Sequence, residues 1–326
     1  MKISEILANE KPTLSFEYFP ARTEKRAERL DKTIDILTEL KPDFVSVTFG
    51  AGGSTKDGSY ELVKKLKEQK KVEVIAYLAT YALKQDEVTD VLNSYKDLGI
   101  ENMLALRGDL PKDGSLTQSP TDSFKHASDL VGFIHQNYSF CLGAAGHPEG
   151  HPDALSIEKD LEYLKYKVDL GAEFVIANFF HDNMYFFKFL ERCAKSGIKI
   201  PILPGIMPLY SIRIMELLAG NCGVSIPDKL RKGIAQLPEN DPKAFFQFGI
   251  EFAIQQCEEL LNEGACGLHL YALNKYESTE GIVKGLKDKG FLTDRGKASR
   301  SSPPGPNESN TMGNYSEDYK SLKRRT

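Results

Sequence analysis

Short runs rich in β-branched and aromatic residues alternate along this chain with longer segments whose apolar residues recur at helical spacing. In the first helical segment, for example, Leu30, Ile34 and Leu37 share one face. This pattern predicts strands over 14–19, 44–51, 72–79, 101–107, 140–146, 173–180, 200–206 and 265–273. It predicts helices over 24–40, 56–69, 86–98, 121–137, 155–170, 183–196 and 276–289, with two or three more between 210 and 263.

Eight strand–helix repeats indicate an α/β protein with a (β/α)8 TIM barrel. An open doubly wound sheet is the alternative, but no G-x-G-x-x-G pattern follows the first predicted strand. The glycines of residues 50–53 are followed by Ser-Thr-Lys, without phosphate-loop spacing. We therefore predict a single catalytic barrel over residues 1–295.

The composition changes from about Gly296 onward. Residues 299–310 are mostly Ser, Pro, Gly and Asn, which cannot bury a core. We predict a disordered C-terminal tail over 296–326. Its basic end, residues 323–325, leaves a docking or targeting role open.

Charge and cysteine usage narrow the possible partners. A formal net charge of −4 over 326 residues argues against a general nucleic-acid or acidic-membrane surface. No run approaches the roughly 18 apolar residues of a membrane span, and no signal peptide is visible. The 5 cysteines form no C-x-x-C pair. Buried or surface thiols in a reducing cytoplasm are expected, with a metal or disulfide role as the minor alternative.

Polar residues stand where the predicted strands end, which in a parallel barrel is the face that carries chemistry. These residues are Glu17, Thr48, Asp109, His147, Asn178 and Tyr271. The sharpest signal is the buried run 104–106, which ends in Arg107, Gly108 and Asp109. The two charges either form a local ion pair that caps a loop or bracket a polar ligand, and Gly108 would allow close approach.

Glu17 lies within an aromatic run, Phe16, Tyr18 and Phe19 being its neighbours. Burying a charged carboxylate there is costly, so its pKa should rise and make it a proton donor near neutral pH. An exposed edge position or a structural ion pair is the alternative.

His147 and His151, with Glu149 and Asp153, look like a metal cluster on paper. The H-E-x-x-H arrangement needs one helix face, however, and Pro148 and Pro152 forbid that helix. We expect a loop that contacts a ligand and no metal site.

The helix predicted after this loop carries a polar face. Asp160, Tyr163 and Lys167 share it, although a solvated surface explains the spacing equally well. His126, His135 and His269 are expected to be packing or surface residues, and His181 remains open.

Taken together, these motifs resemble the methylenetetrahydrofolate reductase family. The matching segments run in family order: 15–20 (SFEYFP), 43–51 (DFVSVTFGA), 105–109 (ALRGD), the loop 147–154, 167–172 (KVDLGA), 204–208 (PGIMP) and 271–274 (YALN). They cover nearly the whole chain apart from the tail.

The resemblance implies a barrel with FAD at its C-terminal face. A reduced nicotinamide cofactor, NAD(P)H, would reduce the flavin, which would then reduce methylenetetrahydrofolate in a ping-pong reaction. It further implies that Glu17 is the general acid and that Asp109 lies between flavin and pterin. A homo-oligomer is also expected.

The resemblance assigns binding roles residue by residue. The positions implied to bind FAD are Thr48, Phe49, Ala51, Tyr77, Arg107, Gly108, Asp109, Ala127, His147, His151, Ala154, Asp160, Tyr163, Tyr166 and Lys167. The positions implied to bind the folate are Glu17, Asp109, Asn178, Tyr271 and Lys275.

Some positions depart from the bacterial pattern of the family. Tyr77 replaces a histidine that contacts the flavin, Asn178 replaces a glutamine that binds the pterin, and His181 replaces a phenylalanine. Ile214 replaces a second glutamine, and Lys275 an arginine. These changes leave two alternatives open: a flavoprotein of the same fold that uses another pterin or electron donor, and a non-catalytic accessory protein.

Overall fold

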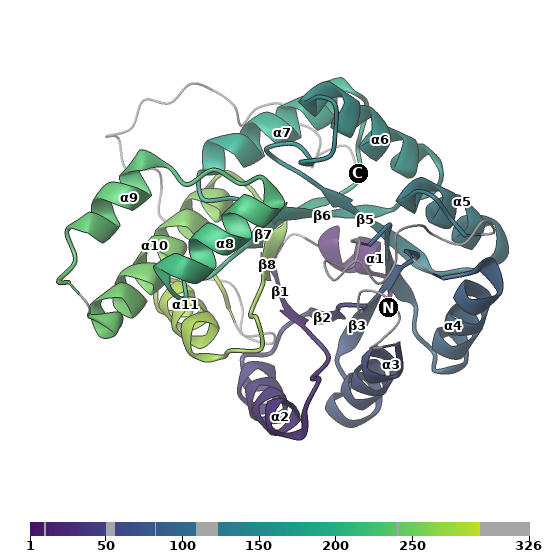
Figure 1. The fold of residues 1–326 in the computed structure, drawn as a ribbon, viewed down its shortest axis with the longest axis horizontal. Helices are drawn as coiled ribbons and strands as arrows, with labels where there is room; N and C mark the ends of the chain where they lie inside the picture. The colour runs from purple at the N-terminus through teal and green to yellow at the C-terminus, as the bar shows by residue number, and fades with distance from the viewer. Residues whose placement is uncertain (10, 50–55, 82, 109–122, 240, 294–326) are drawn as a thin grey trace.

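Eight parallel strands close into a barrel surrounded by helices (Figure 1). The computed structural model describes residues 1–293 except 10, 50–55, 82, 109–122 and 240. The strands pair in chain order, and β1 closes the barrel against β8. The predicted (β/α)8 fold is thus confirmed. The predicted tail, 296–326, lies outside the described residues.

The strands are β1 (Thr13–Tyr18), β2 (Phe44–Val47), β3 (Glu73–Ala79), β4 (Asn102–Leu106), β5 (Cys141–Gly146), β6 (Phe174–Phe179), β7 (Ile202–Ile206) and β8 (Gly267–Leu270). The helices are α1 (Ile3–Leu7), α2 (Glu24–Glu39), α3 (Lys56–Lys65) with a π-helical turn η2 (Leu66–Lys70), α4 (Gln85–Asp97), α5 (Ala127–Asn137), α6 (Ile157–Asp169), α7 (Asn183–Lys195), α8 (Ile212–Cys222), α9 (Asp228–Ala235), α10 (Pro242–Asn262) and α11 (Glu277–Asp288).

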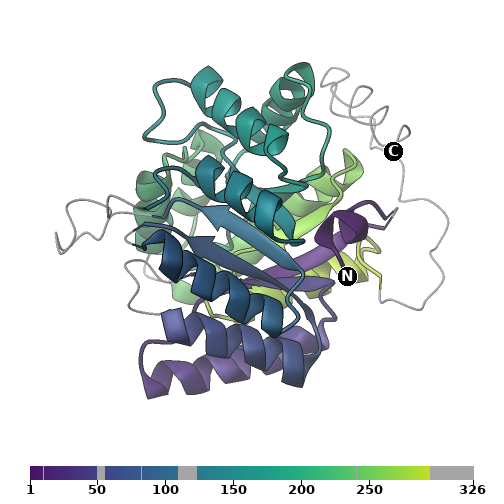
Figure 2. The ribbon, with the colours of Figure 1, turned by 90° about the vertical axis from the view of Figure 1, so that its right-hand side faces the viewer.

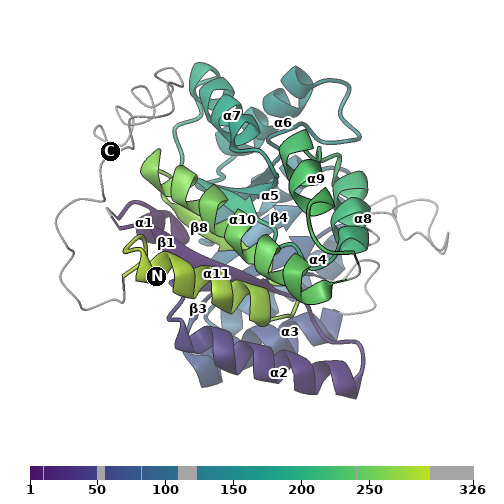
Figure 3. The same cartoon turned by 90° about the vertical axis from the view of Figure 1, so that its left-hand side faces the viewer.

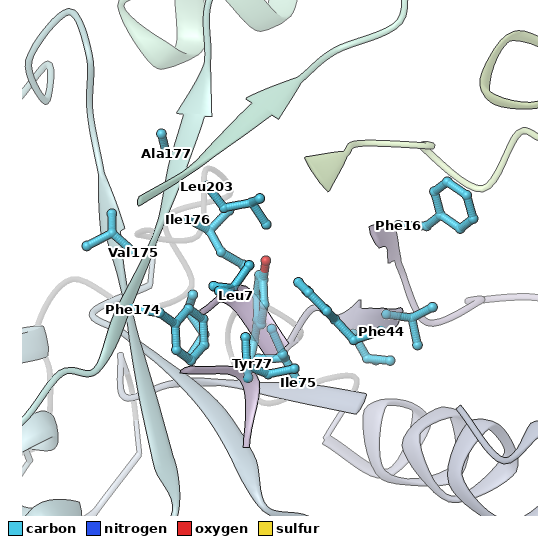
Figure 4. Close-up of a cluster of buried hydrophobic side chains, with 14 of the residues drawn as sticks. Leu7, Phe16, Phe44, Ile75, Tyr77, Phe174, Val175, Ile176, Ala177 and Leu203 are labelled. Atoms are coloured by element: carbon cyan, nitrogen blue, oxygen red, sulfur yellow. The ribbon is translucent and has the colours of Figure 1, made fainter. Parts of the chain in front are cut away.

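The strands are buried on both faces, as parallel strands covered by helices must be. All six residues of β1 are buried, and one hydrophobic core runs through the barrel and its inner helix faces. Figure 4 shows part of this core, where Tyr77 stands beside Ile75 inside the barrel. Several helices begin at side-chain caps: Ser156 accepts from the Lys159 N–H at α6, and Asp182 from the Met184 N–H at α7.

Three predicted elements are wrong in their bounds by three or more residues, one being the strand predicted over 265–273, which is observed over Gly267–Leu270. The helix predicted from residue 121 begins at Ala127, because Asp129 accepts hydrogen bonds from the N–H groups of Lys125 and His126 and caps α5 there. The strand predicted over 44–51 ends at Val47.

Helix α1 was not predicted, because five residues are too few to show a helical period. It lies at the N-terminal end of the barrel (Figure 2), where Asn102 accepts from the Ile3 N–H across 2.8 Å and donates to the Met1 carbonyl across 3.0 Å.

Three helices fill the segment between β7 and β8, as predicted. α8, α9 and α10 enclose a second, smaller core of Leu209, Met215, Leu230 and Phe245. α8 and α9 lie at the end of the barrel opposite α1 (Figure 3). No helix in the described part of the chain is long and apolar enough to cross a membrane.

Candidate functional site

A cavity of about 520 Å³ opens among the C-terminal ends of the strands. Five of the six polar residues predicted at strand ends line it, namely Glu17, Thr48, His147, Asn178 and Tyr271. The sixth, Asp109, lies outside the described residues, as does Ala51. The remaining lining residues are Phe19, Pro20, Arg22, Phe49, Tyr77, Leu104, Leu106, Ala145 and Ile176.

Glu17 is buried at this cavity with 5% of its surface exposed. Burial raises the pKa of its carboxyl to about 7, and a hydrogen bond from the Tyr77 hydroxyl opposes part of that rise. Among the described residues, no cation lies within ion-pair distance of it. The exposed-edge and ion-pair alternatives are therefore wrong, and burial raises the pKa of Glu17 in the direction expected.

Behind Glu17, polar side chains continue into the barrel. Ser15 Oγ lies 2.8 Å from His269 Nδ1, and Ser46 Oγ lies 3.4 Å from His269 Nε2. Burial lowers the pKa of His269 to about 3, so the ring is neutral. His269 is a packing residue, as expected, but one that carries a hydrogen-bond chain.

A β-bulge shapes the wall opposite. The pairing of β6 with β7 shifts between Ile176 and Phe179, so β6 holds one extra residue there. The Tyr271 hydroxyl donates to the Ala177 carbonyl at 3.1 Å. It passes so close to β7 that a Cβ at Gly205 would stand 2.2 Å from that carbonyl oxygen and 2.5 Å from the tyrosine ring. Asn178, next in the bulge, lines the cavity.

The loop after β5 holds two histidines whose rings are in contact. The rings of His147 and His151 meet edge-to-face with centroids 4.7 Å apart. The His151 N–H donates to Asp160 Oδ2 at 3.2 Å, and His147 Nδ1 lies 3.7 Å from the same oxygen. Burial, with the charges of His151 and Lys167, lowers the pKa of His147 to about 3, so that ring is neutral.

Lys167 brings a buried amine to the edge of the cavity. Its Nζ donates to the carbonyl of Ala145, a lining residue, across 2.9 Å. Burial lowers the pKa of Lys167 to about 8, while Asp160 acts to raise it. Asp160 thus turns toward the loop and Lys167 toward the cavity edge, whereas Tyr163, which the spacing put on the same helix face, is 57% exposed.

The same loop is fixed from two sides. Arg107 Nη2 pairs with Asp153 Oδ2 at 2.9 Å, and Glu149 Oε2 accepts from the Ser225 N–H at 3.0 Å beyond the end of α8. No group of three or more His, Cys, Asp or Glu among the described residues could hold a metal ion. The two histidines contact each other and Asp160 rather than forming a ligand set.

Other predicted site residues stand apart from the cavity wall. Tyr163 and Tyr166 are 57% and 54% exposed on α6. Lys275 Nζ lies over the Tyr210 ring, 4.8 Å from its centroid. Ala127, at the start of α5, and Ala154, in the loop, do not line the cavity either. Their binding roles remain predictions.

Some lining residues were missed by sequence reasoning. Leu104, Leu106, Ala145 and Ile176 are apolar and look like ordinary core positions, although they alternate along their strands with residues that face the helices. Arg22 also lines the cavity, five residues after Glu17, and no sequence pattern marked it.

The chain is similar in sequence to proteins of one known family. A model of the family described as methylenetetrahydrofolate reductase matches residues 2–287. The chain is 36% identical over 313 residues to "Methylenetetrahydrofolate reductase (NADH) 1" of Arabidopsis thaliana, with 93% of this chain and 52% of that protein covered. It is 34% identical over 273 residues to the 5,10-methylenetetrahydrofolate reductase of Escherichia coli (strain K12), with 84% and 90% covered.

The chain therefore spans about half the length of the plant relatives and most of the length of the bacterial ones. Among solved structures, it is similar in fold to an uncharacterized protein from Clostridium thermocellum that binds two copies of 5-methyl-5,6,7,8-tetrahydrofolic acid. The TM-score is 0.57 at 18% identity, covering 88% of this chain and 97% of that one.

Proposed function

The chain belongs to the methylenetetrahydrofolate reductase family, and from this premise we propose that it reduces 5,10-methylenetetrahydrofolate to 5-methyltetrahydrofolate with electrons from NAD(P)H. One observation carries the proposal beyond family membership. Glu17 is a buried carboxyl with a pKa raised to about 7, set in the wall of a cavity large enough for a ligand.

Glu17 would act as the general acid. In its protonated form it would donate a proton to a nitrogen of the folate's five-membered ring. The adjacent carbon–nitrogen bond would then break with its electron pair on that nitrogen, leaving an iminium carbon ready to accept hydride. A pKa near the working pH suits this role, because both the acid and its conjugate base are then accessible.

The residues present fit FAD as the cofactor. Leu104, Leu106 and Ile176 give the cavity apolar walls suited to a flat ring system. Gly108 has a positive φ of 87°, and a Cβ there would stand 3.0 Å from that of Ala79, so the tip of β4 presents backbone only. When bound, FAD would supply the hydride chemistry, taking hydride from NAD(P)H and passing it to the folate.

The loop after β5 and helix α6 would hold the rest of the cofactor. The donors gathered there are the neutral His147 ring, the His151 ring and the Lys167 amine. Arg22 is the only cation among the described residues that line the cavity, and it would attract the anionic parts of either substrate.

We place the enzyme in the cytoplasm as a homo-oligomer. The absence of any C-x-x-C pair and the ordinary soluble composition support the compartment. The assembly rests on the family resemblance.

A second candidate is a reductase of the same fold that acts on another pterin or takes electrons from another donor. Asn178 favours it, because its side-chain oxygen accepts from the Phe179 N–H at 2.9 Å and is turned toward its own backbone. An amide oxygen already bonded to its own backbone is less available to hydrogen-bond a pterin than the amide of a longer glutamine would be.

The absorption spectrum of the purified protein is the first test. We expect a yellow protein that bleaches anaerobically with NADH or NADPH and regains its colour when methylenetetrahydrofolate is added. Bleaching without recovery, or bound FAD that neither NADH nor NADPH bleaches, would select the second candidate. A protein that binds no added FAD would support the accessory reading and contradict both enzymatic ones.

Glu17→Gln separates the two half-reactions. Flavin reduction should stay within about twofold, while recovery of colour with folate should slow by about 10²- to 10⁴-fold, the usual contribution of a general acid. Equal loss of both half-reactions would contradict the acid role of Glu17.

A further inference from the structure

Three polar residues of the cavity wall come from neighbouring strands: Glu17 on β1, Thr48 after β2 and Tyr271 after β8. The N–H groups of Thr48 and Tyr271 still donate to carbonyls of adjacent strands, so the alternation of the strands extends to them. Two positions before each of the three stands a buried polar residue, and these are Ser15, Ser46 and His269. Side chains two positions apart share a face of the sheet, so a polar cluster lies one level below this part of the cavity wall.

Hydrogen bonds join the buried cluster across the three strands. Ser15 Oγ on β1 lies 2.8 Å from His269 Nδ1, and Ser46 Oγ on β2 lies 3.4 Å from His269 Nε2. A neutral imidazole has one donor and one acceptor nitrogen, so the ring donates one of these bonds and accepts the other. Each of the three residues is 0% exposed, and solvent therefore does not compete for the bonds. Through them, β8 is tied by side chains to both β1 and β2.

The imidazole of His269 also contacts the aromatic ring of Tyr271. The two ring centroids are 5.1 Å apart and the planes meet at 87°, an edge-to-face arrangement. The other end of the tyrosine is held by the bond from its hydroxyl to the Ala177 carbonyl, and a Cβ at Gly205 would stand 2.5 Å from its ring. Of these three neighbours, only His269 is itself bonded to the strand that carries Glu17.

A buried polar cluster can serve stability alone, but apolar side chains would fill the same space without needing partners. Hydrogen bonds add a fixed lateral position, because they require a particular distance and angle, whereas apolar contacts tolerate sliding. The position that is fixed here is that of β8 relative to β1. These two strands carry the tyrosine and the carboxyl that line the cavity.

We propose that His269 is a positioning residue of the candidate site, which fixes Tyr271 relative to Glu17. Its bonds to the two serines hold the ring in place, and the edge of the ring holds the tyrosine. A pterin that lies against Tyr271 would then meet the proton of Glu17 in one geometry. The inference rests on the proposed function for the identity of the ligand and of the acid. A misplacement of about 1 Å at such a site is enough to slow a reaction by roughly 10²-fold.

Two variants separate positioning from stability. His269→Phe keeps a ring but leaves the Ser46 hydroxyl without this partner, so the midpoint of urea unfolding should fall. The triple variant Ser15→Ala, Ser46→Ala, His269→Phe removes the polar groups together, and the midpoint should recover. Both should slow the folate half-reaction by about 10- to 100-fold. Flavin reduction by NADH does not use the Glu17 proton and should change by less than about threefold.

Thr13→Val is the matched control. Thr13 Oγ1 donates to the Cys266 carbonyl at 3.4 Å, which joins β1 to the residue before β8 at a point farther from the cavity. Its loss should lower the urea midpoint and leave the folate half-reaction as it is.

NMR of the protein as purified, with no folate added, reads the position of Tyr271 directly, and Tyr271→Phe identifies its signals. Cross-peaks between the Tyr271 ring and the Gly205 α-protons should weaken in both His269 variants and persist in Thr13→Val. Unchanged cross-peaks in both, or a folate half-reaction that recovers with stability in the triple variant, would overturn the inference. Should one of the two fail to fold, the other decides; should both fail, Ser46→Ala decides by the same readouts.

Failure of the proposed function would look different. A native protein that never reduces the folate would refute the assigned reaction. Weaker Tyr271 cross-peaks in the variants would still establish that His269 holds the tyrosine, because that measurement needs no turnover.

Discussion

Arg107 and Asp153 form an ion pair, with Arg107 Nη2 2.9 Å from Asp153 Oδ2, that ties the end of β4 to the loop after β5. The hydrogen bond from Arg107 holds the pKa of Asp153 below its ordinary value. The sequence offered an ion pair of Arg107 with Asp109 as one of two alternatives, and Asp109 lies outside the described residues. The described pair joins segments 46 residues apart.

Asp153→Asn should therefore affect the cofactor more than the fold. Both side chains are largely exposed, at 44% and 65%, so the loss in free energy of unfolding should stay below about 1 kcal/mol. FAD should bind about tenfold more weakly, because the loop that we propose to hold it loses this ion pair; tenfold corresponds to roughly 1.4 kcal/mol. Quenching of FAD fluorescence measures the affinity. Glu191→Gln, which breaks the exposed pair with Lys195, is the control and should leave FAD affinity unchanged.

Glu17→Gln should make the protein more stable at alkaline pH. The folded-state pKa is raised from 4.5 to about 7, so between these values the native state holds a proton that the unfolded state has released. Stability then falls as pH rises through this window, by about 3 kcal/mol in total. Glutamine does not ionise, so the variant does not lose this stability as pH rises.

Urea unfolding at pH 4 and pH 8 checks this. The variant should match the native protein at pH 4 and exceed it at pH 8. Glu162→Gln, an exposed carboxyl on α6, should show no comparable gain at pH 8. A Glu17→Gln protein with the same stability difference at both pH values would argue against a raised pKa.

His181→Phe should stabilise the protein, most strongly in acid. Its Nε2 is buried without a hydrogen-bond partner among the described residues, and such a group costs about 1–3 kcal/mol. Burial also lowers the pKa of His181 to about 4, so the unfolded state binds a proton below pH 6.5 that the native state refuses until about pH 4.

The gain from His181→Phe should therefore grow as pH falls from 7 to 5, by about 2 kcal/mol. Thermal or urea unfolding at the two pH values measures it. The exposed His126 provides the control, since His126→Gln should leave the pH dependence as it is. A gain independent of pH would mean that packing alone accounts for the effect.

Asn178→Gln should tighten binding of the folate. The short amide is held by the Phe179 N–H, and a side chain longer by one methylene would reach further into the cavity and bond less readily to its own backbone. We expect about a threefold to tenfold lower Kd, a fraction of the roughly 1–3 kcal/mol that a hydrogen bond to a charged or buried partner supplies. Asn178→Ala should weaken binding. An unchanged Kd in both variants would show that position 178 does not contact the folate.

Local periodicity was sufficient for the barrel, because each strand and helix shows its own burial pattern within 5 to 15 residues. It failed where the deciding contact is distant. α1 is held by Asn102, about a hundred residues away, which no window of neighbouring residues contains. The start of α5 was missed for another reason: Asp129 caps the helix from within its first turn, a local signal that the apolar spacing does not show.

In the candidate site, too, features set by neighbouring residues were predictable and features set by distant contacts were not. The burial of Glu17 followed from its aromatic neighbours, and the prolines at 148 and 152 correctly argued against a helix in the histidine loop. Glu17 on β1 and Tyr77 on β3 line one cavity only because the barrel brings their strands together, and the pairing of Arg107 depends on how two loops meet. Arg22 acquires its place in the cavity wall only once the barrel has closed.

The bulge in β6 limits which single substitutions the cavity wall of this protein can accept. The bulged backbone at Ala177, Gly205 and the Tyr271 side chain are packed against one another. There is no room for a Cβ at Gly205 while the Tyr271 hydroxyl bonds to the Ala177 carbonyl. A saturation library at Gly205 alone would return little besides glycine, whereas libraries that also vary Tyr271 could find new solutions. Substrate preference at this wall should therefore change in jumps of several substitutions.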